Sequence, residues 1–392
     1  MLSILGVARK ALMRNAVRVA AILSLGAVAA CDIPIAGGGP SIDPGAPVPV
    51  ALLVPSGSGQ AGDELLARSL QNAARLAVSD LGASARIDLR VYPTSGQPAA
   101  AQAAAMRAVE DGAQIILGPV FAQEANAVGV AVAPRGINVL SFSNNTDIAG
   151  GNVYVLGPTF RNSAGRLASY AVRQGRRNLL VVHDRTTAGE VGRAAIQQGI
   201  ARAGGTVAGV EGYEFSQNGI ASAAPAIAAR ARAGGADGVF LTADTAGALP
   251  LVSQLLRDNG VTSQFIGLTR WDIPAATLAL PSLQGGWFAL PDPALYAQYQ
   301  SRYQAAFGEA PHPISGLAYD GIAAIGALVK SGNSGALTGA ALTQNAGFVG
   351  VNGIFRLRSD GSNERGLAVA QIRNNQVVVI DPAPRSFSGA GF

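Results

Sequence analysis

Small polar residues follow several strand-like segments in this sequence of 392 residues, and their chemistry suits ligand binding. The set is Ser56, Ser58, Pro119, Ser141, Ser143, Asn144, Asn145, Asp184, Thr242 and Asp244, where Pro119 belongs to a Gly-Pro turn. Hydroxyl, amide and free backbone N–H groups hydrogen-bond well to a carboxylate or a small zwitterion. We therefore expect these residues to line a cleft for a small polar ligand. The alternative is that they are ordinary polar loop residues.

No motif for catalysis accompanies these residues. His183 and His312 are the only histidines, and the sequence contains no HExxH, no GxSxG and no cysteine placed as a nucleophile. The segment 57–62 spells GxGxxG, yet the next expected strand ends Val-Tyr-Pro at 91–93, without the acid that a dinucleotide site needs. We expect a protein that binds rather than catalyses, with no cofactor and no metal.

The single cysteine, Cys31, stands where a lipid anchor is expected. Residues 19–30 read VAAILSLGAVAA and follow Arg14 and Arg18. At about 1.5 Å per residue this run spans roughly 18 Å, too short for a hydrocarbon core of about 30 Å. A basic segment, a short apolar run and small residues are typical of a secretory signal. The run before the cysteine resembles the lipobox of bacterial lipoproteins, in which the signal is removed and the cysteine carries the lipid.

The resemblance to a lipobox implies a location and an organisation for the N-terminal part. Residues 1–30 would be a signal peptide, and residues 31–47, rich in Gly and Pro, would form the lipid anchor and a flexible tether. The protein would then be periplasmic and lipid-anchored to a bacterial membrane, with the inner and the outer membrane both open.

The charge of the chain argues against a nucleic-acid partner. The formal net charge is +5, but Arg9, Lys10, Arg14 and Arg18 all lie in the expected signal peptide. Without these four residues, 25 of the 29 basic residues stand against 24 acidic ones, a net charge of +1. Such a chain has no overall field that would concentrate nucleic acid, so we expect no nucleic-acid partner.

The elements that must position the polar loops alternate between strand-like and helix-like segments. In the first half, strands are expected at 48–54, 87–92, 113–118 and 137–142, with helices near 62–80, 98–111 and 122–134. In the second half, strands are expected at 178–183, 206–213, 236–243 and 264–268, with helices at 160–175, 188–204, 219–233 and 245–259. Such alternation predicts an α/β fold with two parallel sheets, each flanked by helices.

The remaining part of the chain changes character. An apolar segment beginning at 285, GGWFAL, is followed by helices expected at 293–308 and 314–330. Short strands joined by turns then follow, and we expect them at 353–358, 367–373 and 376–380. This pattern predicts a short β-meander at the C-terminus rather than another strand–helix unit.

Several stretches together resemble one known family. They are VALLVPSGSGQAG, GAQIILGP, GINVLSFSNNT, ADGVFLTAD, and Asp184 with Gly189 and Gly192. Their order and character resemble the type 1 periplasmic binding proteins, in particular the leucine/isoleucine/valine-binding family, over residues 48 to about 381. The resemblance implies the two-lobed fold of that family, with a ligand between the carboxyl ends of the strands, where open parallel sheets commonly bind ligands.

The resemblance also implies where the lobes begin and end. The chain would cross between them three times. The first lobe would comprise residues 48–155 and 284–342, and the second lobe residues 156–283 and 343–381. Residues 382–392 would form a tail.

The sequence departs from the amino-acid binders of this family at the expected contacts. In those proteins a serine after the Gly-Pro turn holds the ligand carboxylate, but residues 120–125 read VFAQEA, without a hydroxyl. A threonine of the next loop is replaced by Asn145, and Ala248 falls near the acid that pairs with the ligand's amino group. Asp244 could substitute for that acid. Without a carboxylate, burying an ammonium group is costly.

Two functions therefore stay open. One is solute binding for an ABC importer, with an amino acid or amide as the small polar ligand and an ABC permease as the partner. The other is activation of a penicillin-binding protein, because IILGPVF and VLSFSNN resemble lipoproteins of this fold that regulate peptidoglycan synthesis through protein contact.

Overall fold

The computed structural model describes residues 40–387. Two sheets of short apolar strands form the framework of this part of the chain. Sheet A is five-stranded and parallel, in the order β2-β1-β3-β4-β5. Its strands are β1 (Val48–Val54), β2 (Ile87–Pro93), β3 (Ile115–Leu117), β4 (Val139–Ser141) and β5 (Val153–Val155).

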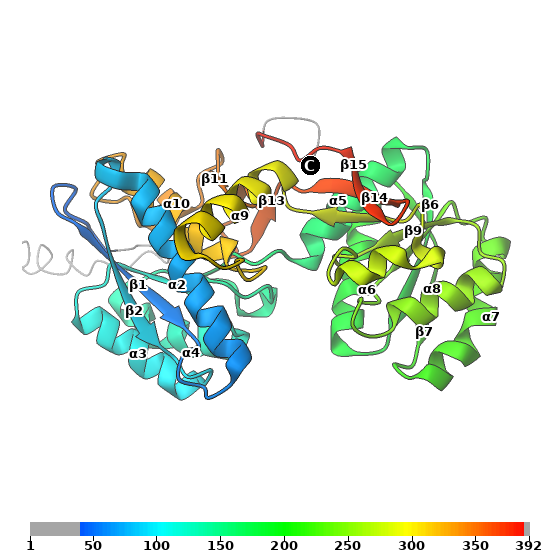
Figure 1. The fold of residues 1–392 in the computed structure, drawn as a ribbon, viewed down its shortest axis with the longest axis horizontal. Helices are drawn as coiled ribbons and strands as arrows, with labels where there is room; N and C mark the ends of the chain where they lie inside the picture. Colours follow the sequence, from blue (N-terminus) through cyan, green and yellow to red (C-terminus); the bar gives the residue numbers. More distant parts are fainter. Residues whose placement is uncertain (1–39, 388–392) are drawn as a thin grey trace, which may run out of the picture. The chain divides into compact units, whose positions relative to one another are not determined.

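Helices cover both faces of sheet A (Figure 1). They are α2 (Ala61–Leu81), α3 (Pro98–Glu110), α4 (Ala122–Val132), α9 (Pro293–Phe307) and α10 (Gly316–Val329). Alternate side chains of β1 point to opposite faces, because successive residues of a strand do so. Leu52 joins a cluster with α2, α9 and α10, whereas Leu53 joins a cluster with α3 and α4. Burial on both faces explains why the strand is a continuous apolar run.

Sheet B has seven strands in the order β15-β14-β10-β9-β8-β6-β7. They are β6 (Asn178–Asp184), β7 (Thr206–Tyr213), β8 (Gly238–Leu241), β9 (Gln264–Gly267), β10 (Trp287–Leu290), β14 (Ala368–Arg373) and β15 (Gln376–Asp381). Strands β6 to β10 pair in parallel, while β14 and β15 are antiparallel additions at one edge.

Four helices cover sheet B, again on both faces (Figure 1). They are α5 (Phe160–Arg173), α6 (Thr187–Arg202), α7 (Gln217–Ala233) and α8 (Leu249–Asp258). Helices α5 and α6 share one hydrophobic cluster with the sheet, and α7 and α8 share another. Trp271 and Trp287 are both buried in these clusters, so both tryptophans are core residues.

A small antiparallel sheet, sheet C, precedes β14 and β15 in the chain. It consists of β11 (Phe348–Gly350), β12 (Gly353–Leu357) and β13 (Asn363–Arg365). The short helix α11 (Gly339–Leu342) precedes it, and 3₁₀ turns lie at Gly82–Ser84, Ala133–Arg135, Thr146–Ile148, Ala275–Ala279 and Pro281–Leu283. Phe348 and Phe355 of sheet C belong to the same cluster as α2 and α10. We call sheets A and C with their helices lobe 1, and sheet B with its helices lobe 2.

The expected α/β fold class with two lobes and a small antiparallel C-terminal sheet is confirmed, with a parallel sheet A and a mixed sheet B. The assignment of segments to lobes differs at two places. Residues 284–342 were expected in the first lobe, yet β10 pairs with β9 and β14 in sheet B. Residues 343–381 were expected in the second lobe, yet sheet C packs into the core of lobe 1. A buried apolar strand fits either sheet, so its composition alone does not reveal its partner.

The strand pairing places the passages of the chain between the lobes. They fall at residues 156–159, 291–292 and 366–367, which we call the crossovers. The second and third crossovers therefore lie later than the boundaries at 283/284 and 342/343 that the sequence suggested.

The segment expected to be a tether is in part ordered against lobe 1. Ile42 is only 5% exposed within the lobe 1 cluster, and its N–H donates to the carbonyl of Ser334 at 2.9 Å. The expected signal peptide, the lipidation of Cys31, the tether up to residue 39 and the tail from residue 388 lie outside the described residues. None of the helices between residues 40 and 387 combines the length and the hydropathy that crossing a membrane requires.

Candidate functional site

The expected site residues after β3 and β4 build their own loop. The Oγ of Ser141 donates to the carbonyl of Pro119 at 3.0 Å, and the backbone N–H of Ser143 donates to Ser141 Oγ at 3.1 Å. The Oγ of Ser143 in turn accepts from the N–H of Asn145 at 3.1 Å. Both serines are buried, at 0% and 6% exposure. Their hydroxyl groups thus help to shape the turn.

The loop after β1 is closed in a similar way. Ser58 Oγ accepts from the N–H of Gln60 at 3.1 Å, and the N–H of Gly57 donates to Glu64 Oε1 at 2.6 Å. Ser56 is half-buried, and its carbonyl accepts from the N–H of Ser95. These bonds fix the entry into α2, which accounts for the glycine-rich spacing without a nucleotide.

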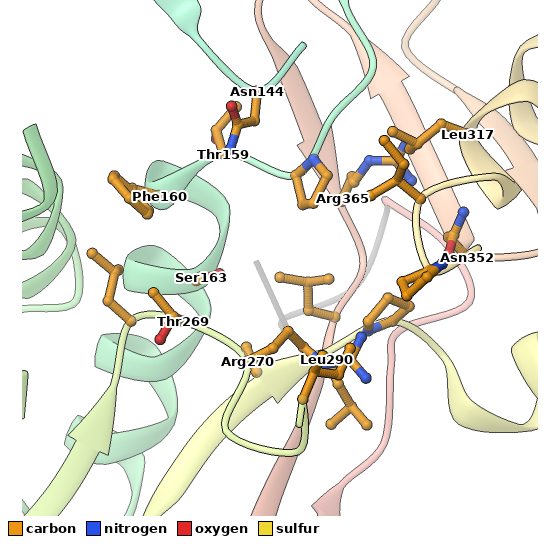
Figure 2. Close-up of a pocket in the computed structure, with 18 residues that line it drawn as sticks. Asn144, Thr159, Phe160, Ser163, Thr269, Arg270, Leu290, Leu317, Asn352 and Arg365 are labelled. Carbon is orange, nitrogen blue, oxygen red and sulfur yellow. The ribbon is translucent and has the colours of Figure 1, made fainter. Parts of the chain in front are cut away.

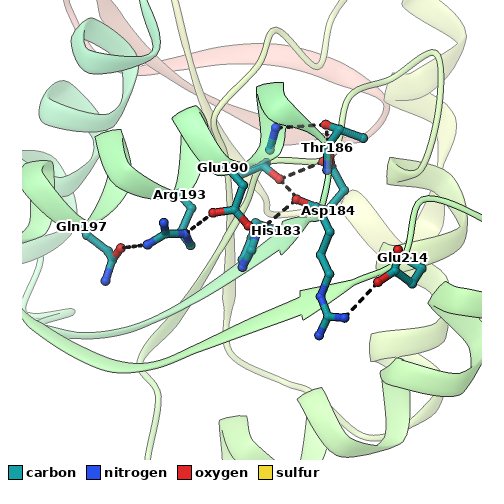
Figure 3. Close-up of polar contacts among 10 residues, drawn as sticks. His183, Asp184, Thr186, Glu190, Arg193, Gln197 and Glu214 are labelled. Carbon is teal, nitrogen blue, oxygen red and sulfur yellow. Dashed lines mark hydrogen bonds and ion pairs between the residues drawn. The ribbon is translucent and has the colours of Figure 1, made fainter.

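Asp184 and Thr186 hold the start of α6 (Figure 3), and Thr242 contacts Asp184. The carboxylate of Asp184 accepts from the N–H of Thr186 and from Thr242 Oγ1, both at 3.2 Å. A side chain at Gly189 would collide with the carbonyl and carboxylate of Asp184, so this turn requires glycine there. Asp244 is exposed. The Asp-x-x-x-x-Gly pattern therefore encodes a tight connection from strand to helix.

His183 takes part in a polar chain along α6 (Figure 3). Its buried Nδ1 lies 3.0 Å from the carbonyl of Asp184 and 3.4 Å from Glu190 Oε1. Glu190 Oε2 accepts from Arg193 Nε at 2.7 Å, and Arg193 donates onward to Gln197 at 2.6 Å. These contacts hold His183, Glu190 and Arg193 in one polar network along α6.

A pocket of about 260 Å³ lies where the crossovers come together, and we call it the crossover pocket (Figure 2). Each crossover supplies part of its wall: Pro158 and Thr159 come from the first, Pro291 from the second and Leu367 from the third. Leu290 and Arg365, which precede the second and third crossovers, also line it. The other lining residues are Asn144, Phe160, Ser163, Leu268, Thr269, Arg270, Ile273, Ala289, Pro313, Ile314, Leu317 and Asn352.

The walls of the crossover pocket are mainly apolar, with a few polar groups among them. The side chain of Thr159 caps α5, because its Oγ1 accepts a hydrogen bond from the N–H of Asn162. Figure 2 shows the side chains of Asn144 and Ser163 at one wall of the pocket. Apolar walls with a few placed polar groups are typical of small-molecule sites.

The charges at the crossover pocket are already paired. The guanidinium of Arg270 forms two bonds to Asp272, one of them 2.6 Å long. Arg365 Nη1 lies 3.0 Å from Asp320 Oδ2. No residue lining the pocket carries a carboxylate, so the described walls offer no acid to an ammonium group.

The pair of Asp320 and Arg365 joins the crossovers to lobe 1. Asp320 is fully buried in α10 and accepts from the N–H of Val351 at 2.8 Å and from Asn352 Nδ2 at 3.0 Å. Arg365, 5% exposed, also donates from Nε to the carbonyl of Leu156 at 2.9 Å. A buried ion pair depends on such additional bonds, because both charges have lost their water.

Of the ten residues expected at the site, only Asn144 lines the crossover pocket. The other residues lining it could not be predicted from the sequence, because they come from segments whose contact depends on the sheets that β10 and the strands of sheet C join. One signal was present: Asp320 is an acid inside a strongly apolar helix, which indicates a buried partner. Within the described part of the chain, no cluster of His, Cys, Asp and Glu side chains is suited to hold a metal ion.

Comparison with known proteins agrees with this architecture. The family model described as "Periplasmic binding protein" matches residues 47–376. A branched-chain amino acid ABC transporter periplasmic ligand-binding protein from Burkholderia xenovorans is 17% identical, with a TM-score of 0.67 over 87% of this chain and 97% of that one.

Two further solved structures resemble the chain. An ABC transporter substrate-binding protein from Desulfitobacterium hafniense in complex with Leu is 16% identical, with a TM-score of 0.63 over 86% of this chain and 100% of that one. A leucine-, isoleucine-, valine-, threonine- and alanine-binding protein from Brucella ovis is 17% identical, with a TM-score of 0.65 over 88% and 96% of the two chains. A search of curated protein sequences finds no match. Because the family model spans most of its length, the chain belongs to the periplasmic binding protein family.

Proposed function

We propose that this chain is the solute receptor of an ABC importer and that the crossover pocket holds its ligand. The observation that carries the proposal is the position of the pocket, whose walls come from all three crossovers. Bending at the crossovers would change these walls together, so a ligand that prefers one arrangement would shift the balance between arrangements. A permease could then recognise the liganded form.

The chemistry of the walls narrows the class of ligand. A volume of about 260 Å³ suits a small molecule, and the apolar side chains suit an aliphatic part. Asn144 and Ser163 supply an amide and a hydroxyl group. Since the lining contains no carboxylate, an amide, or an amino-acid derivative without a free ammonium group, fits better than a free amino acid.

Activation of a penicillin-binding protein is the second candidate. The same missing carboxylate favours it, because a protein that acts through surface contact does not need to retain contacts with an amino acid. Under this alternative the crossover pocket would remain without a ligand. The two functions therefore predict opposite results in a binding experiment.

A thermal-shift screen separates these functions. The full chain, purified in mild detergent, is heated with amino acids, their N-acetyl derivatives, aliphatic amides without an amino group, and cell-wall peptides. A ligand at 100 times its Kd adds about 2.7 kcal/mol to the stability of the folded state. We expect an amide or N-acyl derivative to raise the Tm. No shift with any compound, together with stimulation of a purified penicillin-binding protein, would instead support the activator.

Variants tie the shift to the crossover pocket. Asn144→Ala removes a polar group from the wall, and Ser163→Phe places a ring in the space. Both are expected to abolish the ligand-induced shift. Asn126→Ala and Ser79→Phe change exposed residues of α4 and α2 in the same way and should leave the shift intact. An equal loss in the controls would mean that the pocket is not the site.

We further propose that Cys31 carries the lipid that anchors the protein in the periplasm. The apolar run and small residues before Cys31 support this proposal, and the family is periplasmic. Buried lipid chains contribute about 0.8 kcal/mol per CH₂ group to membrane binding. Cys31→Ser should move the protein from the detergent phase to the aqueous phase in a phase-partition assay. Detergent-phase partition of the variant would contradict the anchor.

A further inference from the structure

A second cavity, of about 400 Å³, is rich in arginine. It shares only Arg365 with the lining of the crossover pocket. Its walls come from α5, α6 and the turn between β12 and β13, and we call it the arginine pocket. Two carboxylates line it, those of Asp360 and Glu364. Five guanidinium groups line it as well, those of Arg161, Arg166, Arg202, Arg358 and Arg365.

Close helix packing and one hydrogen bond set the walls of the arginine pocket. A side chain at Gly199 of α6 would meet the backbone of Ala164 at 2.9 Å, so the two helices approach closely there. Asn162 Nδ2 donates to the carbonyl of Asn363 at 3.1 Å and ties α5 to β13. The arginines on these elements therefore project from fixed backbone positions.

Ion pairs occupy three of the five arginines that line the pocket, because Arg358 pairs with Glu364, Arg166 with Asp381 and Arg365 with Asp320. Glu364 is shared, since Arg356 Nε lies 2.7 Å and Arg358 Nη1 2.9 Å from its Oε2. Asp360 accepts from the N–H of Ser362 at 3.0 Å and from the hydroxyl of the same residue.

Two of the arginines are available to a ligand. Arg161 and Arg202 are exposed, and no ion pair joins either of them to another described residue. Arg161 interacts electrostatically with Asp360 without forming an ion pair with it. Arg365 also lines the crossover pocket, but its ion pair with Asp320 occupies it.

One buried polar atom on the lining residues has no hydrogen-bond partner, namely Oδ1 of Asn363, a residue 2% exposed. The Nδ2 of Asn363 donates to the carbonyls of Val155 and Gly157, each at 2.8 Å, which fixes the orientation of the amide. The buried Arg166 is paired, because its Nη1 lies 2.9 Å from Asp381 Oδ2. The arginine pocket thus presents one unused buried acceptor. Unsatisfied buried polar groups are costly and indicate a missing partner.

We propose that the arginine pocket binds a soluble phosphate compound, either inorganic phosphate or a phosphate monoester that carries hydroxyl groups. Phosphate oxygens accept the charge-assisted bonds that guanidinium groups donate, and they match the geometry of arginine. Inorganic phosphate keeps a P–OH group near neutral pH, which can donate to the Asn363 oxygen. The volume of the pocket leaves room for the organic part of a monoester.

The proposal goes beyond solute reception and does not depend on it. It is tested by isothermal titration of the full chain in mild detergent, at constant ionic strength, with inorganic phosphate, glycerol 3-phosphate and sulfate. Sulfate has the same shape but no proton to donate near neutral pH. We expect phosphate and glycerol 3-phosphate to bind at least about tenfold more tightly than sulfate.

Three variants locate the binding. Arg161→Gln and Arg202→Gln are each expected to weaken phosphate binding about tenfold. Arg75→Gln removes an exposed charge from α2 and should change nothing. All three positions are exposed, so the Tm without ligand should stay near that of the unmodified chain. The absence of phosphate binding, equal affinity for sulfate, or an equal loss in all three variants overturns the proposal.

Discussion

Replacing Asp320 by alanine should weaken the fold more than any surface substitution. The carboxylate is fully buried, and it accepts from two backbone N–H groups, from Asn352 Nδ2 and from the guanidinium of Arg365. Its removal leaves Arg365, 5% exposed, as a buried charge without a counter-ion. Breaking one side of a buried pair costs about 3–5 kcal/mol, and we expect a loss of this size.

Urea unfolding followed by tryptophan fluorescence and circular dichroism measures this loss. With a slope of about 3 kcal/mol per molar urea, the midpoint should fall by roughly 1–1.7 M. Glu309→Ala is the matched control, because the pair of Glu309 with Arg68 is 3.3 Å long and exposed to solvent. Exposed pairs contribute about 0–1 kcal/mol, so this variant should hardly change the midpoint.

A double replacement tests the cause of the loss. Asp320→Leu with Arg365→Met removes both charges and should recover much of the stability, since apolar residues often replace a buried pair at little cost. If Asp320→Ala costs no more than Glu309→Ala, the buried pair does not hold the crossovers to lobe 1. If the double replacement is as unstable as the single one, an unpaired charge is not the reason.

Two further substitutions test burial and packing. Burial raises the pKa of Glu124, so the folded state holds this proton more tightly than the unfolded state does. Its contribution to stability is therefore greatest below the unfolded pKa and is lost as the pH rises through the folded value. Glu124→Gln should make the chain more stable at pH 7. In urea titrations between pH 4 and 8, it should also make the free energy of unfolding depend less on pH. The matched change at the exposed Glu110, Glu110→Gln, should have neither effect. Gly267→Ala would press a methyl group into the ring of Trp271 and should cost about 1–3 kcal/mol, while Gly62→Ala in open space should leave the Tm equal or higher.

The strands that the sequence located best are those buried on both faces or paired over their full length. The expected bounds 48–54 and 206–213 agree with β1 and β7, because their apolar and β-branched residues contrast with the turns that flank them. The three-residue strands β5 and β11 were missed, since such a short segment has no periodicity.

The candidate site was harder to derive than the fold. Loop hydroxyls such as those of Ser141 and Ser143 looked available in the sequence, but they satisfy neighbouring backbone groups. The crossover pocket combines residues as distant as Asn144 and Leu367. Their contact depends on the sheet that β10 joins, and no local pattern encodes that choice.

A crystal structure of the chain with the compound that gives the largest thermal shift tests directly whether the crossover pocket is the ligand site. We predict that the ligand lies in the crossover pocket and contacts Asn144 and Ser163. A ligand bound instead at the loops of Ser58 and Asp184, with the crossover pocket empty, would contradict the account.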